Sequence, residues 1–302
     1  MSPTEPNNAN TPNLQQDSLA ETVISSRPGV QLVQALRDLV EYRELFYAFV
    51  SRNIMIRYKQ TALGVIWVIL QPLITGVVFA AIFGLIRGQF SGIDALLFFM
   101  AGLVPWTSFQ NGVQMAALSL EQNANLVSKV YFPRMTVPAS QVISSLVDFL
   151  IAYTTLIIIA LVGGVFTPQL IGWLLPLLFL QLIAGLGLGL FFSVLNAQYR
   201  DVKYIIPFIL QLGMFITVWV PLEDWGNGKI GFGENTDWVS PYLYFLLSLN
   251  PMAAVVETYR ALLAGNAVNL VLLAKGTISA LVFFIIGFQF FTAREKRLVD
   301  IL

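Results

Sequence analysis

Residues 137–162 read "VPASQVISSLVDFLIAYTTLIIIALV", and this stretch decides the fold class because Asp148 is the only charged residue in it. At a rise of about 1.5 Å per residue, a helix over this stretch exceeds the roughly 30 Å hydrocarbon core of a bilayer. Pro138 stands at its start, where a helix loses nothing by lacking an N–H donor. The stretch therefore predicts a membrane-spanning helix.

Five more apolar stretches repeat this pattern, in a chain that is 57% hydrophobic and 11% charged. A soluble domain carries about a quarter charged residues. The predicted spans are Leu63–Ile86, Ala95–Leu120, Val137–Val162, Leu170–Asn196, Tyr204–Val220 and Leu270–Thr292. The expected fold is an all-α integral membrane protein with six transmembrane helices.

The composition argues against an enzyme. There is no Cys, which excludes disulfides, thiol catalysis and thiolate metal sites. There is no His, which removes the commonest general base and metal ligand. The net charge is zero, so nothing points to nucleic acid. We expect no catalytic residue, no metal site and no nucleic-acid partner.

The N-terminal part divides into two segments ahead of a membrane domain at residues 61–302. Residues 1–29 are rich in Pro, Asn, Ser and Thr and lack the apolar core of a signal peptide, which predicts a disordered cytoplasmic tail. Residues 30–60 place apolar side chains at spacings of three and four between charges. They predict an amphipathic helix that lies in the membrane interface, or else packs against another domain in solvent.

The basic residues predict the topology. Of the 17 Lys and Arg, 13 lie in the N-terminal region, the second-to-third and fourth-to-fifth loops and the C-terminal segment. The other four are Arg87, Lys229, Arg260 and Lys275. Since cytoplasmic loops carry the excess of Lys and Arg, we expect both termini inside the cell and residues 221–269 outside.

The outer segment, residues 221–269, opens polar and rich in Gly and then becomes apolar in two pieces of about ten residues each, separated by "LNP" at 249–251. Neither piece is long enough to cross the hydrocarbon core. They predict re-entrant or interfacial half-helices, which are tolerated where protein or water covers the backbone.

A short basic and aromatic segment, "NANLVSKVYFPRM" at residues 123–135, separates the second span from the third. Half of it is apolar, which predicts a short amphipathic helix that ends at Pro133 and is capped by Asn123 or Asn125. Aromatic side chains beside Arg and Lys suit a groove on another protein, and they equally suit the lipid headgroup level.

Four motifs carry a resemblance to a known family. They are "SRNIMIRYKQTALGVIWVILQPL" at 51–73, "NANLVSKVYFPRMTVPAS" at 123–140, "NAQYRDVKYIIP" at 196–207 and "LNPMAAVVETYRALLAG" at 249–265. Together they resemble the transmembrane subunit of ABC-2-type exporters, in the branch that exports O-antigen, capsular polysaccharide and teichoic acid. The likeness covers about residues 40–300. The polar N-terminal tail and the extended outer loop at 222–240 depart from it.

The resemblance implies a homodimer in the inner (plasma) membrane of a bacterium, with two copies of a separate ABC ATPase and a lipid-linked polysaccharide as cargo. Residues 226–231, "GNGKIG", lack the first Gly of a P-loop. ATP and Mg would therefore bind the partner ATPase, and this chain would bind no cofactor.

The resemblance also assigns roles to individual residues. The loop at 121–134 would be the coupling helix that fits a groove of the ATPase, and "QYRDVK" at 198–203 would make a second cytoplasmic contact. The coupling residues would be Glu121, Asn125, Leu126, Lys129, Val130, Tyr131, Phe132 and Arg134. The half-helix that follows "LNPM" would form an external gate with Asn250, Pro251 and Arg260.

Two spans carry polar side chains at spacings of i, i+3, i+4 and i+7, so each set shares one helix face. They are Thr107, Gln110, Asn111 and Gln114 in the second span, and Gln141, Ser144, Ser145 and Asp148 in the third. Such faces avoid lipid, so they either join helices or line a passage that binds sugar hydroxyls. For the passage we single out the second-span set with Ser144 and Asp148.

Aromatic side chains of the first two spans either stack on sugar rings or pack the core: Phe79, Phe83, Phe98, Phe99, Trp106 and Phe109. Gly185 and Gly189 have the spacing that lets two helices approach closely.

Three rivals remain. An ABC-2 exporter of drugs or small molecules would share the fold. A membrane-embedded glycosyltransferase should show carboxylate pairs such as D-x-D near a cytoplasmic face, and none occurs there. A secondary transporter should show two broken helices in corresponding halves, and only one broken region is present.

Overall fold

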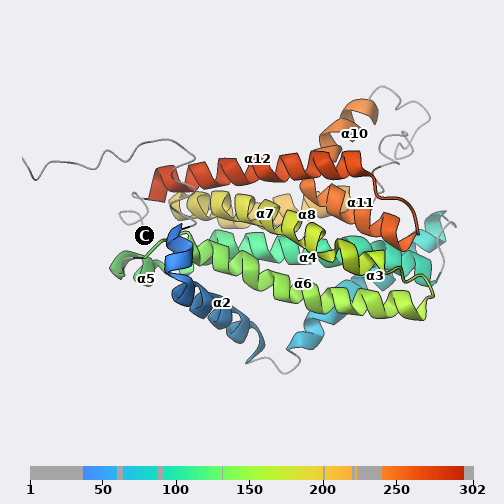
Figure 1. The fold of residues 1–302 in the computed structure, drawn as a ribbon, viewed down its shortest axis with the longest axis horizontal. Helices are drawn as coiled ribbons and strands as arrows, with labels where there is room; N and C mark the ends of the chain where they lie inside the picture. Colours follow the sequence, from blue (N-terminus) through green and yellow to red (C-terminus); the bar gives the residue numbers. More distant parts are fainter. Residues whose placement is uncertain are drawn as a thin grey trace, which may run out of the picture.

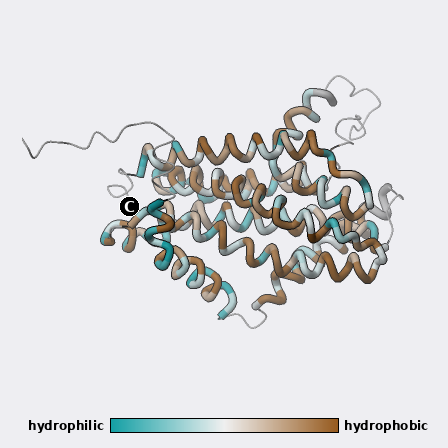
Figure 2. The backbone as a smooth tube through the Cα atoms, viewed as in Figure 1, coloured by the Kyte–Doolittle hydropathy of each residue, from teal (hydrophilic) through white to brown (hydrophobic). Residues whose placement is uncertain are grey.

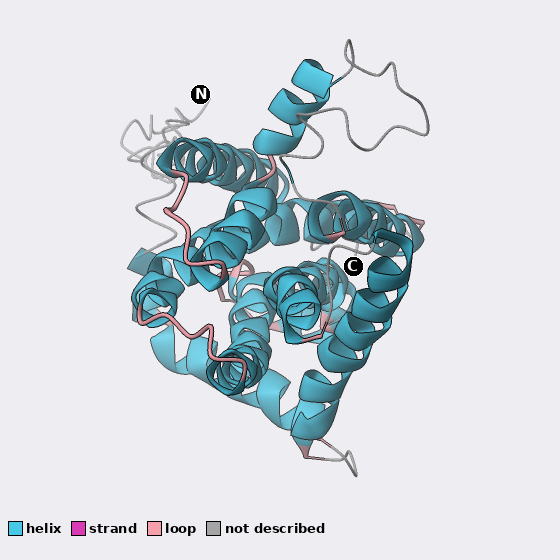
Figure 3. Ribbon diagram, turned by 90° about the vertical axis from the view of Figure 1, so that its right-hand side faces the viewer, coloured by secondary structure: helices cyan, strands magenta, loops and turns pink. Residues whose placement is uncertain are grey.

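The computed structural model describes residues 37–59, 64–87, 92–130, 132–199, 201–219, 222 and 240–295, with the side chains of 83–87, 240, 241 and 243 left out. Over these ranges every regular element is a helix (Figure 3). The helices are α2 (Arg43–Tyr58), α3 (Val65–Arg87), α4 (Ile93–Gln122), α5 (Ala124–Lys129), α6 (Thr136–Val162), α7 (Gln169–Gln198), α8 (Val202–Val218), α10 (Ser240–Ser248), α11 (Pro251–Leu263) and α12 (Leu270–Arg294). The predicted all-α membrane class is confirmed.

Five of these helices, α3, α4, α6, α7 and α12, are long and apolar enough to cross a membrane. The remaining predicted span, Tyr204–Val220, which is the fifth in chain order, corresponds to α8, an apolar helix of 17 residues. At 1.5 Å per residue α8 is about 26 Å long, a little less than the hydrocarbon core. Apolar residues fill the middle of the long helices, and hydrophilic ones gather toward their ends (Figure 2).

Successive long helices run in opposite directions along the bundle (Figure 1). One end, which we call the α5 end, holds α5, the turn between α7 and α8, and the last turn of α12. The opposite end, the α11 end, holds residues 163–168, the short helix α10 and the start of α12. The segments predicted to be cytoplasmic therefore share one end, and those predicted to be external share the other.

Helix α4 is the centre of the core, since it packs against α3, α6, α7, α8 and α11. Val104, Val113 and Ala117 on α4 are fully buried. By contrast, α3, α8 and α12 keep apolar side chains exposed, among them Trp67 and Phe208. An apolar exposed helix face is compatible with lipid or with another protein chain.

Helices α7 and α12 touch through their backbones at two glycines. A Cβ on Gly187 would lie 2.6 Å from the carbonyl carbon of Phe283, and a Cβ on Gly287 would overlap the carbonyl oxygen of Gly187. The predicted pair Gly185 and Gly189 faces the other way, toward Val142 of α6. Helix α7 thus uses small residues on two sides, and both sides pack inside this chain.

The amphipathic stretch predicted over residues 30–60 is interrupted. Residues 37–41 are helical, but the backbone leaves the helical conformation at Tyr42 (φ −92°, ψ 26°) before α2 begins. Helix α2 packs along α6, with Phe49 and Asn53 buried. Residues 30–36 and 60 lie outside the described residues, as does the predicted disordered tail at 1–29.

The two short apolar pieces of the predicted outer segment form separate helices, α10 and α11, of 9 and 13 residues. At about 14 and 20 Å, neither spans the hydrocarbon core. Pro251 begins α11, and the side chain of Asn250 caps it by accepting a hydrogen bond from the Met252 N–H at 3.0 Å. Of residues 221–239 the structure describes only Leu222.

We expect Gly287→Ala to destabilise the protein, because the new methyl group would force α7 and α12 apart. Overpacking of this kind costs about 1–3 kcal/mol or more. The measurement is the melting temperature of the detergent-solubilised chain. Gly172→Ala on α7 is the control, since a Cβ there meets no atom within 4 Å. Equal melting temperatures for the two variants would contradict the close contact.

Candidate functional site

The segment at residues 121–134, predicted to be the coupling helix, contains the six-residue helix α5. Asn123 occupies the N-cap position but its side chain does not cap the helix. Instead its Oδ1 accepts a hydrogen bond from Arg52 of α2 at 2.9 Å, and its Nδ2 donates to the Ser119 carbonyl at 2.7 Å. The predicted cap thus joins the segment to α2.

The inner face of this segment is anchored by Val127 and Phe132, which are buried. The Phe132 ring lies 5.8 Å from the Phe49 ring of α2, centroid to centroid. Arg52 covers the Phe49 ring at 4.9 Å. These buried residues belong to an apolar cluster at the α5 end, and Leu126 packs against it. Its buried side chains are Phe49, Leu120, Val127, Phe132, Val137, Leu190, Val194 and Phe291. Phe132 therefore holds the segment to the bundle and is not presented at the surface.

The outer face is formed by Asn125, Lys129 and Val130, which are all exposed. Val130 keeps 51% of its surface exposed. An exposed Val beside a Lys offers a partner both an apolar contact and a charge. Tyr131, the other predicted aromatic contact, lies outside the described residues.

Both ends of the segment are tied to other helices. Glu121 accepts a hydrogen bond from Asn196 of α7 at 3.0 Å, and it lies 3.7 Å from the Lys203 ammonium at the start of α8. At the other end, the Arg134 N–H donates to the Glu295 carboxylate at 3.3 Å, and the Arg134 guanidinium donates to the Glu295 carbonyl. Segment 121–134 is thus linked to α2, α7, α8 and the end of α12.

Glu295 sits directly after α12 in a half-buried position. Burial raises the pKa of this carboxyl above its ordinary value, while the hydrogen bond from Arg134 and the Arg134 charge act in the opposite direction. Arg134 therefore favours the ionised form of this carboxyl, against the effect of burial.

The polar face of α6 is used for helix contacts. Asn53 of α2 donates to the Ser140 hydroxyl at 3.1 Å, and Ser144 donates to the Ser140 carbonyl at 2.6 Å and to the Val50 carbonyl of α2 at 3.4 Å. On the α4 side, Ser108 donates to the Ser145 carbonyl at 2.8 Å. Gln141 is buried in the same face.

Asp148 of α6 forms an ion pair with Arg57 and accepts a hydrogen bond from the Tyr58 hydroxyl. Its side chain is 9% exposed. Both partners come from the last turn of α2, which reaches along α6 to this level. The two helices are therefore joined by a charge pair within the apolar bundle. The side chain of Ser144, one turn earlier, is also occupied by this helix contact.

The sequence alone did not predict this pair, because Arg57 and Tyr58 belonged to a stretch expected to lie on the membrane surface. A usable signal was present. An ionisable side chain inside a span pairs with another polar group or faces water, and Arg57 is a basic residue near the end of the charged stretch that precedes the first span.

The polar face of α4 is different, because Thr107, Gln110, Asn111 and Gln114 are all only half-buried. Thr107 donates to the Leu103 carbonyl of its own helix at 2.7 Å. Gln110 accepts from the indole N–H of Trp106 at 3.1 Å. This face is therefore part of the surface of the chain, whereas the α6 face is covered by α2 and α4.

The aromatic candidates mostly pack the core. Phe99, Trp106 and Phe109 are buried inside this chain. Phe79 contacts Trp219 with ring centroids 4.0 Å apart. The side chain of Phe83 is outside the described part, and Phe98 lies beneath Arg260.

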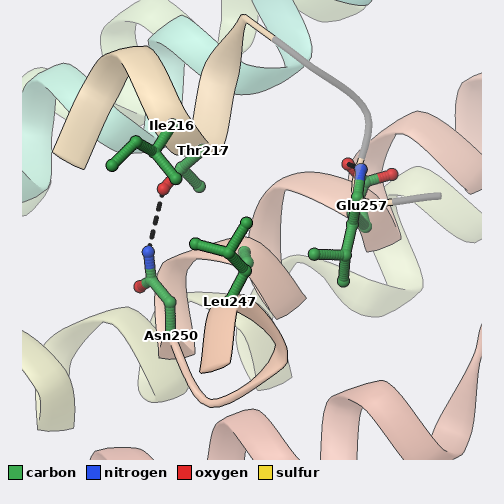
Figure 4. Close-up of a pocket in the computed structure, with 7 residues that line it drawn as sticks. Ile216, Thr217, Leu247, Asn250 and Glu257 are labelled. Atoms are coloured by element: carbon green, nitrogen blue, oxygen red, sulfur yellow. Dashed lines mark hydrogen bonds between the residues drawn. The ribbon is translucent and has the colours of Figure 1, made fainter. Parts of the chain in front are cut away.

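The predicted gate residues connect α11 to α8 at the α11 end. Besides capping α11, Asn250 donates to the Thr217 hydroxyl of α8 at 2.8 Å (Figure 4). A cavity of about 10 Å³ lies beside this bond, which is room for about one water. Glu257, which lines it, accepts a hydrogen bond from the Leu222 N–H at 3.1 Å.

Arg260 contacts α4 as well as α8. Its side chain is 6% exposed and lies 2.8 Å from the Glu257 carboxylate. It also donates to the Val218 carbonyl at the end of α8, and its guanidinium lies 3.8 Å from the Phe98 ring centroid. Asn250 and Arg260 therefore hold α11 against α8 at two points, with Pro251 in the first turn between them.

Within the described residues, no three His, Cys, Asp or Glu side chains are grouped to hold a metal ion.

Comparison with known proteins places this arrangement in context. The sequence matches the family model described as ABC-2 type transporter over residues 44–264. It is 26% identical over 233 residues to the O-antigen export system permease protein RfbA of Myxococcus xanthus, covering 76% of this chain and 84% of that protein. An O-antigen export system permease protein RfbA of Klebsiella pneumoniae is 25% identical over 262 residues, 86% of this chain and 95% of that protein. The polysialic acid transport protein KpsM of Escherichia coli is 24% identical over 256 residues, 83% and 94% of the two chains.

We expect Asp148→Leu to lower the melting temperature strongly, because it leaves the Arg57 charge without its carboxylate inside the bundle. Breaking a buried pair costs about 3–5 kcal/mol. The double variant Arg57→Leu with Asp148→Leu removes both charges and should recover most of that loss. The measurement is thermal unfolding of the chain in detergent for both single variants and the double variant. Additive losses would show that the pair contributes no coupling.

Proposed function

The chain belongs to the ABC-2 type transporter family, and we propose that it is the permease subunit of an ATP-driven exporter that moves a lipid-linked polysaccharide across the membrane. The polymer would be of the O-antigen, capsule or teichoic acid type. The observation that carries this proposal is full-length similarity to polysaccharide permeases: the alignments cover 95% of an O-antigen export permease and 94% of a polysialic acid transport protein.

Family membership implies an ABC ATPase as the partner. We infer two copies of that ATPase on a homodimer of this chain, with ATP and Mg bound by the ATPase and no cofactor on the permease. The exposed apolar faces of α3 and α8 are compatible with a second copy as well as with lipid. The half-buried polar face of α4 supports a second copy, because such a face must meet water or protein within the membrane.

The orientation we propose puts the α5 end in the cytoplasm of a bacterium, with both termini there. The excess of Lys and Arg supports this assignment, since segments with 13 of the 17 basic residues are connected to that end. The α11 end would then face outward, and α10 and α11 would form the external gate.

The proposed coupling role rests on the contacts that attach segment 121–134 to the helix bundle. Its exposed face, Asn125, Lys129 and Val130, is available to the ATPase. Its buried face passes any displacement to α2 through Phe132 and Phe49. Two further links, at Glu121 and Arg134, lead to the other helices of the bundle. A push on the segment would therefore move these helices as rigid bodies, a common way of switching between conformations.

For the passage itself, the polar face of α4 is better supported than that of α6. Thr107, Gln110, Asn111 and Gln114 offer amide and hydroxyl groups that suit sugar hydroxyls. Ser144 and Asp148 are engaged with α2, so they would contact the polymer only in a conformation in which α2 has moved away from α6.

Val130→Asp should reduce the ATPase activity that the permease induces in its partner by about tenfold, because an exposed apolar contact becomes a charge in the docking groove. A loss of about 1.4 kcal/mol in binding corresponds to that factor. The measurement is ATP hydrolysis by the purified complex, together with co-purification of the two proteins. Val40→Asp is the matched control, since Val40 is 67% exposed and lies outside the segment. Equal activity of the two variants would argue against docking at Val130.

Deletion of the gene should abolish the surface polysaccharide of its host and leave lipid-linked polymer inside the cell. The measurement is antibody or lectin labelling of intact and opened cells. Restoring the gene should restore surface labelling. Unchanged surface polymer in the deletion strain, with ATPase activity that responds to apolar drugs, would instead identify a small-molecule exporter.

A further inference from the structure

Two adjoining cavities lie at the α11 end, on either side of Arg260. The larger has a volume of about 450 Å³ and the smaller about 280 Å³. They share Phe98, Arg260 and Ala264 as lining residues. We call the two together the Arg260 cavity. Small-molecule sites in proteins occupy about 300–1,000 Å³, so each cavity is near or within the size of a ligand site.

The charges of the Arg260 cavity do not favour an anion. The guanidinium is already paired with Glu257 at 2.8 Å. A second carboxylate, Asp94 of α4, lines the smaller cavity. Among the described lining residues, one cation therefore stands beside two carboxylates, and a phosphate or another acidic group would meet a site of net negative charge.

The remaining groups of the larger cavity suit a neutral ligand with many hydroxyls. Asn266 carries an amide that both donates and accepts, whereas Asn269 offers its amide N–H groups, because its oxygen caps α12 by accepting from the Leu272 N–H at 3.0 Å. Glu257 accepts and Arg260 donates. Tyr244 and Phe98 add aromatic surface. Paired hydrogen-bonding groups next to aromatic rings fit a sugar, which has polar edges and apolar faces, better than they fit a purely apolar drug.

We propose that the Arg260 cavity binds one or two uncharged sugar residues of the exported polymer. This inference rests on the proposed function and deepens it by placing a saccharide site at the outer end of the passage. The site is built into the gate, because Arg260 also bonds the end of α8 and covers Phe98 of α4. A sugar held there would contact α4, α10 and α11 at once, and it would hold the polymer after it has passed the membrane.

The test uses the full chain with its ATPase in lipid nanodiscs. The probes are di- and trisaccharides prepared by partial hydrolysis of the polysaccharide on the host cell surface, and inorganic pyrophosphate as an anionic comparison. Saturation-transfer NMR and calorimetry measure binding. The wild-type complex should bind the saccharides in preference to pyrophosphate. Tyr244→Ala and Asn266→Ala should each weaken saccharide binding about tenfold or more.

Tyr242→Ala is the matched control, since Tyr242 lies on the same short helix but is 77% exposed and lines neither cavity. It should bind as the wild type does. If Tyr244→Ala does not fold, Asn266→Ala decides the matter, because Asn266 is an exposed residue of the loop before α12.

Three results would overturn the saccharide site: no saccharide binding by the wild type, equal binding by the cavity variants and Tyr242→Ala, or tighter binding of pyrophosphate that is lost in the cavity variants. The proposed function fails separately, if deletion of the gene leaves surface polysaccharide intact. A strain that needs the gene for surface polymer, with a complex that binds no saccharide, would refute the further inference alone.

Discussion

The ion pair between Arg57 and Asp148 is the constraint on which the rest of the arrangement depends. A carboxylate in an apolar bundle must be paired or face water, and here its partners come from α2, a helix too charged to span the membrane itself. Once α2 is held along α6 by this pair and by Asn53, Phe49 in the middle of α2 lies against Phe132. The same helix therefore joins the polar face of a span to the segment that we propose receives force from the ATPase.

The two ends of the bundle are built differently around α4. At the α5 end, segment 121–134 is fixed on its inner side by apolar packing, and it is tied at both ends by polar contacts to α7, α8 and α12. At the α11 end, α8 and α11 meet through hydrogen bonds made by Asn250 and Arg260. Helix α8 has contacts at both ends: its own Lys203 lies beside Glu121 of segment 121–134, and the carbonyl of its last residue, Val218, accepts a hydrogen bond from Arg260. Helix α8 therefore connects segment 121–134 with the residues at the α11 end.

Much of this could be predicted from the sequence. Long apolar stretches determined the spans to within two residues over the described part, because hydropathy over such a length outweighs local detail. The interruption between α10 and α11 at Asn250 and Pro251 could also be predicted from the sequence. The direction of the side chains after α5 could not be predicted, because the chain leaves the helical conformation at Val130 and no helical period applies there. Phe132 is buried, while Val130 is exposed. The partners of Asp148 and Arg260 were also missed, since they are contacts between helices distant in sequence, which periodicity does not encode.

The central claim is that segment 121–134 and α2 move as one body when the ATPase closes. The chain has no cysteine, so spin labels at N125C and Y47C, both at exposed positions, report on the segment and on α2 without further substitutions. The distance between the two labels is measured by pulsed electron paramagnetic resonance in spin-diluted complexes, without nucleotide and with ATP trapped. The account predicts an unchanged distance within each chain, while the distance between N125C labels of two copies changes. A shift of several ångströms within one chain would contradict it.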